Sequence, residues 1–205
     1  MENNELLFLS LNQFIELKKD EKGQYNGFSF PPFYKVSKLK DKLPLSYNDS
    51  IILIHYLSLQ QTFLERNGCG FFKLSFEDII IIEFNDLKRE FVELDVDGHN
   101  DSHSFLYFAY LNPYHIKQIN KGNIIFNSPF IMDCFCAPEI LALSVIPAAV
   151  SYKCFYYSLG VLVIHCLGLG LGLDSDLEVI YDTKLYWLLK RIMVIEPNKR
   201  ILLLG

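Results

Sequence analysis

The 205-residue sequence lacks the patterns that mark several common classes of protein. Its 19 Lys and Arg residues are scattered among 24 Asp and Glu residues, so no basic block offers a surface for the phosphates of a nucleic acid. Its five cysteines include one C-x-C pair, Cys134 and Cys136, but no second Cys or His pair at zinc-site spacing. The odd cysteine count and the lack of a secretory leader favour a reducing compartment, and we expect a cytoplasmic protein.

Motifs that hold nucleotides or metals are missing as well. The sequence has no G-x-x-x-x-G-K-[ST] string, and no G-x-G-x-x-G string followed by V-A-I-K. The glycines that alternate from Gly168 to Gly172 follow an apolar segment instead of opening a helix, so they are not a phosphate loop. The polar loop from Asp95 to Ser104 has its glycine at the fourth position, where an EF-hand needs it at the sixth. We therefore expect no cofactor and no specific metal site.

Hydrophobic residues are what the chain has in abundance. They make up 51% of the sequence, and 15% of it is aromatic, which argues against disorder and for one folded domain or one domain with a small extension. Frequent Ile, Asn, Lys, Phe and Tyr suggest an AT-rich coding genome, such as that of a large DNA virus or an intracellular parasite. For a viral protein, the expected location is the host cytoplasm or the virion.

The longest uncharged stretch, residues 154–173, is about long enough to cross a bilayer. Against a membrane span, it contains His165 and three glycines in its last third, and only Lys153 flanks its N-terminal end. We favour a fully buried core helix from about Lys153 to Cys166. A membrane protein that spans the bilayer at 154–173 is kept as an alternative.

Hydrophobic periodicity, together with capping and turn residues, predicts the main helices and strands. Ser46 begins the clearest helix, with Asp49 as a capping partner, and Asn67-Gly68 ends it. The continuous β-branched run Ile79 to Phe84 predicts the first arm of a hairpin, and Glu90 to Leu94 the second. A last amphipathic helix is predicted from Asp182 to Val194.

Three short strings near the end of the chain carry a family resemblance. They are Ala137-Pro138-Glu139, Tyr157-Ser158-Leu159-Gly160-Val161 and Pro197-Asn198-Lys199-Arg200. In this order they resemble the C-terminal lobe of the eukaryotic protein kinases, with its A-P-E string, the W-S-L-G-V start of its central buried helix and its closing D-P-x-x-R element. The resemblance implies a buried ion pair between Glu139 and Arg200, because a desolvated carboxylate needs a bidentate cation.

The same resemblance implies that phosphoryl transfer has been lost. The family pattern H-R-D-L-K-P-E-N aligns best with residues 71–78, which puts Lys73 at the catalytic aspartate and Ser75 at the lysine that supports the transferred phosphate. An ammonium group cannot accept the proton of a substrate hydroxyl as a carboxylate does. Asp78 falls at the asparagine that binds metal and Asp95 at the D-F-G aspartate. These two are candidate ligands for a divalent ion, although a solvated acidic turn is the favoured interpretation at 95.

These observations predict an α+β, mainly α fold, with a kinase C-lobe-like helical body, small β-hairpins and an N-lobe that is reduced or missing. Residues 1–43 would be an N-terminal extension or N-lobe remnant, and 44–205 the kinase C-lobe-like domain. We expect a pseudokinase, a catalytically inactive kinase-like protein that acts as a protein-binding or scaffold module. A structural subunit of a larger assembly and a mimic that interferes with kinase signalling both fit. Residual nucleotide binding or weak phosphotransfer through Asp78 and Asp95 is a further alternative.

Overall fold

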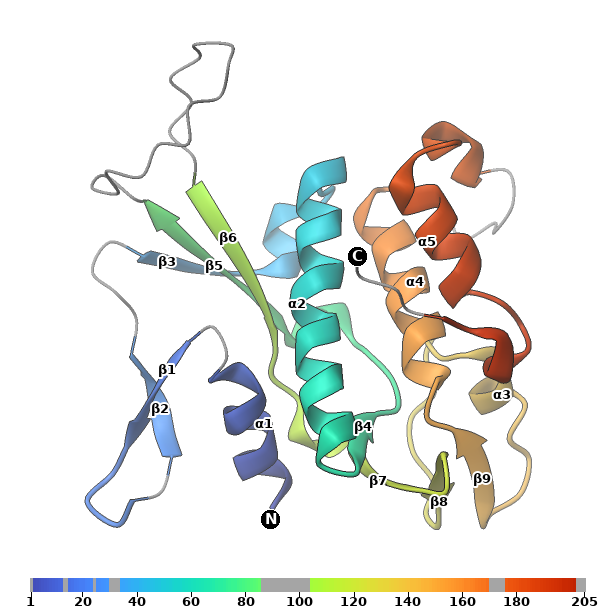
Figure 1. Ribbon diagram of the computed structural model, residues 1–205, viewed down its shortest axis with the longest axis horizontal. Helices are drawn as coiled ribbons and strands as arrows, with labels where there is room; N and C mark the ends of the chain where they lie inside the picture. Colours follow the sequence, from blue (N-terminus) through green and yellow to red (C-terminus); the bar gives the residue numbers. More distant parts are fainter. Residues whose placement is uncertain are drawn as a thin grey trace.

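A computed structural model describes residues 2–12, 15–23, 25–29, 34–85, 104–169 and 176–201. Helix α2 lies in the middle of the molecule, with a three-stranded sheet on one side of it and helices α4 and α5 on the other (Figure 1). A second, four-stranded sheet lies at the end of the molecule where α2 stops (Figure 1). The main core is formed where α2 packs between strand β6 and helix α4.

The helices comprise five α-helices and five 3₁₀ turns among the described residues. The α-helices are α1 (Asn3–Leu11), α2 (Tyr47–Arg66), α3 (Pro138–Leu141), α4 (Cys154–Cys166) and α5 (Lys184–Ile192). The 3₁₀ turns are η1 (Leu39–Lys42), η2 (Phe76–Asp78), η3 (Pro113–His115), η4 (Asp176–Ile180) and η5 (Pro197–Lys199).

The strands of the described residues form three antiparallel sheets. The two-stranded sheet pairs β1 (Glu16–Lys19) with β2 (Tyr25–Ser29). The three-stranded sheet has the order β3 (Tyr34–Lys38), β5 (Ile79–Asn85), β6 (Ser104–Tyr110). The four-stranded sheet has the order β4 (Cys69–Phe71), β7 (Ile116–Asn120), β8 (Asn123–Phe126), β9 (Ala148–Ser151).

The expectation of a mainly helical body with small hairpins and a reduced or missing N-lobe is wrong. Nine strands lie beside the five α-helices in the part of the chain that the structure describes, so the fold is α+β without a helical majority. Strands β3 and β7 were not predicted from the sequence, because most of their residues are polar or exposed. Strand β3 is an edge strand with four of its five residues exposed, and β7 buries only Ile116 fully, so neither has a continuous apolar run.

The predicted hairpin has a different second arm. Strand β5 pairs with β6 in an unbroken register from Ile79 opposite Tyr110 to Asn85 opposite Ser104. The expected arm, Glu90 to Leu94, lies outside the described residues. The two paired strands are separated by residues 86–103, and no local turn signal fixes the register across so long a connection.

The predicted bounds of helix α2 are confirmed. The Ser46 hydroxyl oxygen accepts a hydrogen bond from the Asp49 backbone N–H at 3.0 Å and donates one to the Asp49 carboxylate at 2.8 Å. This satisfies a backbone donor that the first turn of a helix leaves without an intrahelical acceptor. At the other end the chain leaves the helix through Gly68, whose φ of +69° lies in the left-handed region that glycine tolerates best.

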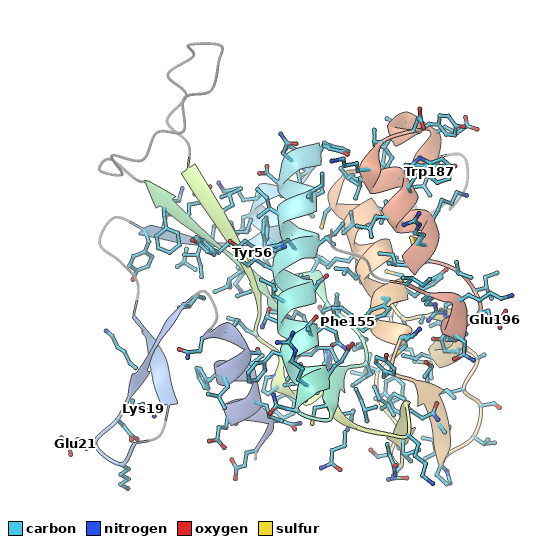
Figure 2. All side chains as sticks on the ribbon, viewed as in Figure 1. Lys19, Glu21, Tyr56, Phe155, Trp187 and Glu196 are labelled. Atoms are coloured by element: carbon cyan, nitrogen blue, oxygen red, sulfur yellow. The ribbon has the colours of Figure 1, made fainter. Side chains whose placement is uncertain are left out.

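Helix α4 is a core element. Each of its 13 residues is buried except His165, and Phe155, labelled in Figure 2, lies in the space between α4 and α2. Helix α5 covers the other side of α4 with Leu185, Leu189 and Ile192, while Trp187 lies on its outer side and is 49% exposed (Figure 2). Within the described ranges, no helix is both long and apolar enough to cross a membrane.

Candidate functional site

A cleft of about 540 Å³ opens where three segments of the chain meet. Its walls come from the turn after β4 (residues 72–78), from the run through η3 into β7 (112–117), and from the end of β8 onward (126–131). Strands β4 and β7 pair with each other, and β7 pairs with β8, so the four-stranded sheet brings all three segments to one side.

Lys73 is the central cation of this cleft. Its side chain is only 7% exposed, and its ammonium group donates to the Asp133 carboxylate at 2.7 Å and to the Ile131 backbone carbonyl at 2.9 Å. A buried ammonium without a partner is costly, so these two contacts hold both the lysine and residues 131–133 in place. Asp133 also accepts from the Phe135 backbone N–H at 3.0 Å, which orients the carboxylate.

Asp78, the candidate metal ligand from the sequence, lies in the same cleft. Its carboxylate accepts a hydrogen bond from the Asn112 side-chain amide at 2.7 Å. Ser75 also lines the cleft, and its backbone carbonyl accepts from the Asp78 N–H. Asp95, the expected partner of Asp78, lies outside the described residues. Among those the structure describes, no group of three or more His, Cys, Asp or Glu side chains is placed to hold a metal ion.

Asn112 is the residue that the sequence interpretation missed. It follows strand β6 and opens turn η3, where its side-chain oxygen accepts from the Tyr114 backbone N–H at 3.0 Å. An Asn before a Pro-initiated turn at the end of an apolar strand was the available signal. The signal was local, and nothing in the sequence placed Asn112 beside Asp78, 34 residues away.

The buried Tyr110 is paired with His115, which lines the cleft. The Tyr110 hydroxyl is hydrogen-bonded to Nδ1 of His115. Burial, followed by the positive charge of Lys73, lowers the pKa of His115 to about 4. Burial, followed by the charge of Asp78, raises the pKa of Tyr110. Near neutral pH the imidazole is therefore uncharged and the phenol keeps its proton, so the hydrogen bond joins two neutral side chains.

Aromatic rings form the apolar wall of the cleft. Phe72 lies edge-on to Phe126 and Phe130, with ring centroids 5.2 and 5.1 Å apart, and the last two rings stack at 4.6 Å. Such arrangements add stability beyond the burial of area alone. Next to this wall, the Ile131 side chain is 83% exposed although its backbone carbonyl is bound by Lys73.

The structure brings Glu139 and Arg200 together, away from the cleft lining. The Arg200 side chain is fully buried and donates to both carboxylate oxygens of Glu139, at 2.5 and 2.7 Å. Its remaining N–H groups donate to the backbone carbonyls of Val194, Ile195 and Lys153. All five guanidinium donors therefore have an acceptor. This contact ties α3 to the chain beyond α5.

The ionisable side chains described above are each held by another group of the chain. The Lys73 ammonium is held in an ion pair, the His115 imidazole is hydrogen-bonded and weakly basic, and the Asp78 carboxylate is bonded to an amide. Sequence comparison does not extend this picture: no family model matches the chain, and no curated protein matches it either.

Proposed function

We propose that the chain is a kinase-like protein without catalytic activity, which works by binding other proteins. The kinase-like part of the proposal is supported by the contact between the first and last of the three strings. Arg200 donates two hydrogen bonds to Glu139, and the buried helix α4 contains the second string. A fully buried and fully satisfied guanidinium is the role that the resemblance assigns to Arg200.

The observation that carries the proposal is the ion pair of Lys73. The resemblance assigns this position to the residue that accepts the proton of the substrate hydroxyl. An ammonium group has no lone pair for that proton, and here it is also held by Asp133 and the Ile131 carbonyl. Losing the base while keeping a well-packed scaffold favours a binding role over phosphoryl transfer.

The same ion pair supports a particular docking surface. Lys73 fixes the backbone of residues 131–133, while Ile131 and Met132 keep 83% and 38% of their side-chain surface exposed. A segment that is already ordered loses little conformational entropy when a partner binds. We therefore propose that a partner protein contacts this segment. The five free cysteines, four of them buried, agree with the cytoplasmic location that is part of the proposal.

The experiment is a comparison of two surface variants in affinity capture from cells that express the chain. Ile131→Asp places a charge at the proposed docking surface, and Val179→Asp places one on η4, where Val179 is 77% exposed. We expect a stoichiometric partner that the wild type and Val179→Asp retain and Ile131→Asp loses. If the wild type retains no stable partner, or if both variants retain it equally, the proposed binding role at this surface is wrong.

A further inference from the structure

The segment from Tyr110 to Ile116 has two sides with different neighbours. One side faces the cleft through Asn112, Tyr114 and His115. The other side contacts the N-terminal helix α1, which lies outside the cleft lining and plays no part in the proposed function. A change in how α1 docks would therefore reach the cleft through a single segment of seven residues.

Asn3, in the first turn of α1, holds one end of this segment. Its side-chain amide donates to the backbone carbonyl of Pro113 at 3.1 Å and to that of Ile116 at 3.0 Å. The first carbonyl belongs to the first residue of turn η3 and the second to the residue just after it, so a single amide bridges the turn. Both are main-chain acceptors, and the contact thus fixes the path of the backbone and does not depend on a neighbouring rotamer.

Ser10, in the last turn of α1, reaches the other end of the segment through Gln60 of α2. The Gln60 amide donates to the Ser10 hydroxyl and to the Tyr110 carbonyl, both at 3.2 Å, and its oxygen accepts from the Tyr110 N–H at 2.8 Å. Ser10, Gln60 and Tyr110 are all fully buried. A buried amide network of this kind gives a defined geometry only when each member is satisfied.

Apolar contacts hold α1 in place between these two polar ones. Leu6 and Leu7 pack into the main core, whereas Leu11 belongs to a separate cluster with Ile82 and Ala109 of the three-stranded sheet. A nine-residue helix is too short to be stable by itself in water. Its folding is therefore tied to docking, and we expect its release to be a local opening.

We propose that helix α1 is a clamp that sets the geometry of the cleft from behind, through Asn3 at Pro113 and Ile116 and through Ser10 and Gln60 at Tyr110. Docking of α1 and the cleft-facing conformation of residues 110–116 are then thermodynamically linked. By reciprocity, a protein that captures α1 reshapes the cleft, and a ligand that fills the cleft strengthens the docking of α1. This inference holds whether or not the cleft binds the proposed protein partner.

Hydrogen exchange followed by mass spectrometry tests the clamp in the full chain without any ligand. The test variants are Asn3→Ala and Ser10→Ala, each of which removes one polar contact of α1. Asn4→Ala is the matched control, because Asn4 is exposed and sits in the same turn of the same helix, so the change in helix propensity is equal. The readouts are a peptide that covers residues 110–117 and a reference peptide within 155–164 of α4.

We expect exchange in residues 110–117 to become about three- to tenfold faster in Asn3→Ala and in Ser10→Ala, with no change in 155–164 and none in Asn4→Ala. An unchanged rate in 110–117 for both test variants would overturn the clamp. So would a rise of equal size in 155–164, because α1 would then add only to global stability. Since partner capture is not part of this test, its outcome is independent of the proposed function.

Discussion

Two buried cations among the described residues are paired with carboxylates, and they differ in what they hold. Arg200 is fully buried and joins α3 to the end of the chain through Glu139, which is 20% exposed. Lys73 is 7% exposed and joins the turn after β4 to residues 131–133 through Asp133, which is 31% exposed. One pair thus locks a piece of core, and the other fixes a surface segment. The comparison teaches that similar chemistry ties core elements together at one site and holds a surface segment at the other.

The largest expected effect is at the core pair. Arg200→Ala removes the donor to the Glu139 carboxylate and to the backbone carbonyls of Val194 and Ile195, so we expect a loss of about 3–5 kcal/mol in the free energy of unfolding. Urea denaturation measures it. Arg191→Ala, on the exposed face of α5, is the control and should change stability by less than about 0.5 kcal/mol. Equal effects of the two changes would mean that the Arg200 contacts add nothing.

A smaller effect is expected at the cleft pair. In Lys73→Ala the Asp133 carboxylate is exposed enough to be hydrated, so we expect a loss of about 2 kcal/mol. The second signature is local: hydrogen exchange of residues 129–135 should accelerate more than that of α4. A stability loss as large as that of Arg200→Ala, without this local acceleration, would show that Lys73 belongs to the core and does not order the surface segment.

Gly160 tests how tightly the core around Arg200 is packed. A Cβ atom at this position would lie 2.3 Å from Cγ of Met193, so in Gly160→Ala either the Met193 side chain or the helices themselves must shift. We expect a loss of about 1–2 kcal/mol in the free energy of unfolding, measured by urea denaturation. Gly160→Ala should cost less stability when it is made in the Met193→Ala variant than when it is made in the wild type. An equal cost in the two would place the strain elsewhere.

The smallest effect is a pH dependence at the cleft. The pKa of His115 is lowered to about 4 in the folded chain, below its ordinary value near 6.5, so the unfolded chain binds more protons between these values. The contribution of His115 to stability is fully present above pH 6.5 and is lost as the pH falls toward 4. Lys73, Asp78, Asp133 and Lys117 set the local charge. Melting temperatures between pH 7 and 5 should fall less steeply for His115→Gln than for the wild type, and parallel slopes would contradict this.

The parts of the fold that the sequence predicted are those with local signals. The Ser46 cap, the Gly68 end and the core helix α4 each follow from residues within one or two turns of each other. The pairing of β5 with β6 and the meeting of Asp78 with Asn112 are long-range contacts, and periodicity gives no register across them. The clamp by α1 was equally hidden, since Asn3 acts on carbonyls more than 100 residues away. The pairing of Arg200 with Glu139, 61 residues away, was expected only because the three short strings resemble those of a known family.

The most direct test of the central claim is the melting temperature of the purified chain in millimolar ATP and Mg²⁺. Our account holds that the ammonium of Lys73, tied to Asp133, makes the cleft a binding surface for proteins and not a site of phosphoryl transfer. It predicts that adding ATP and Mg²⁺ does not change the melting temperature of the wild type or that of Asp78→Ala. A saturable rise that Asp78→Ala abolishes would contradict it and support the nucleotide-binding alternative.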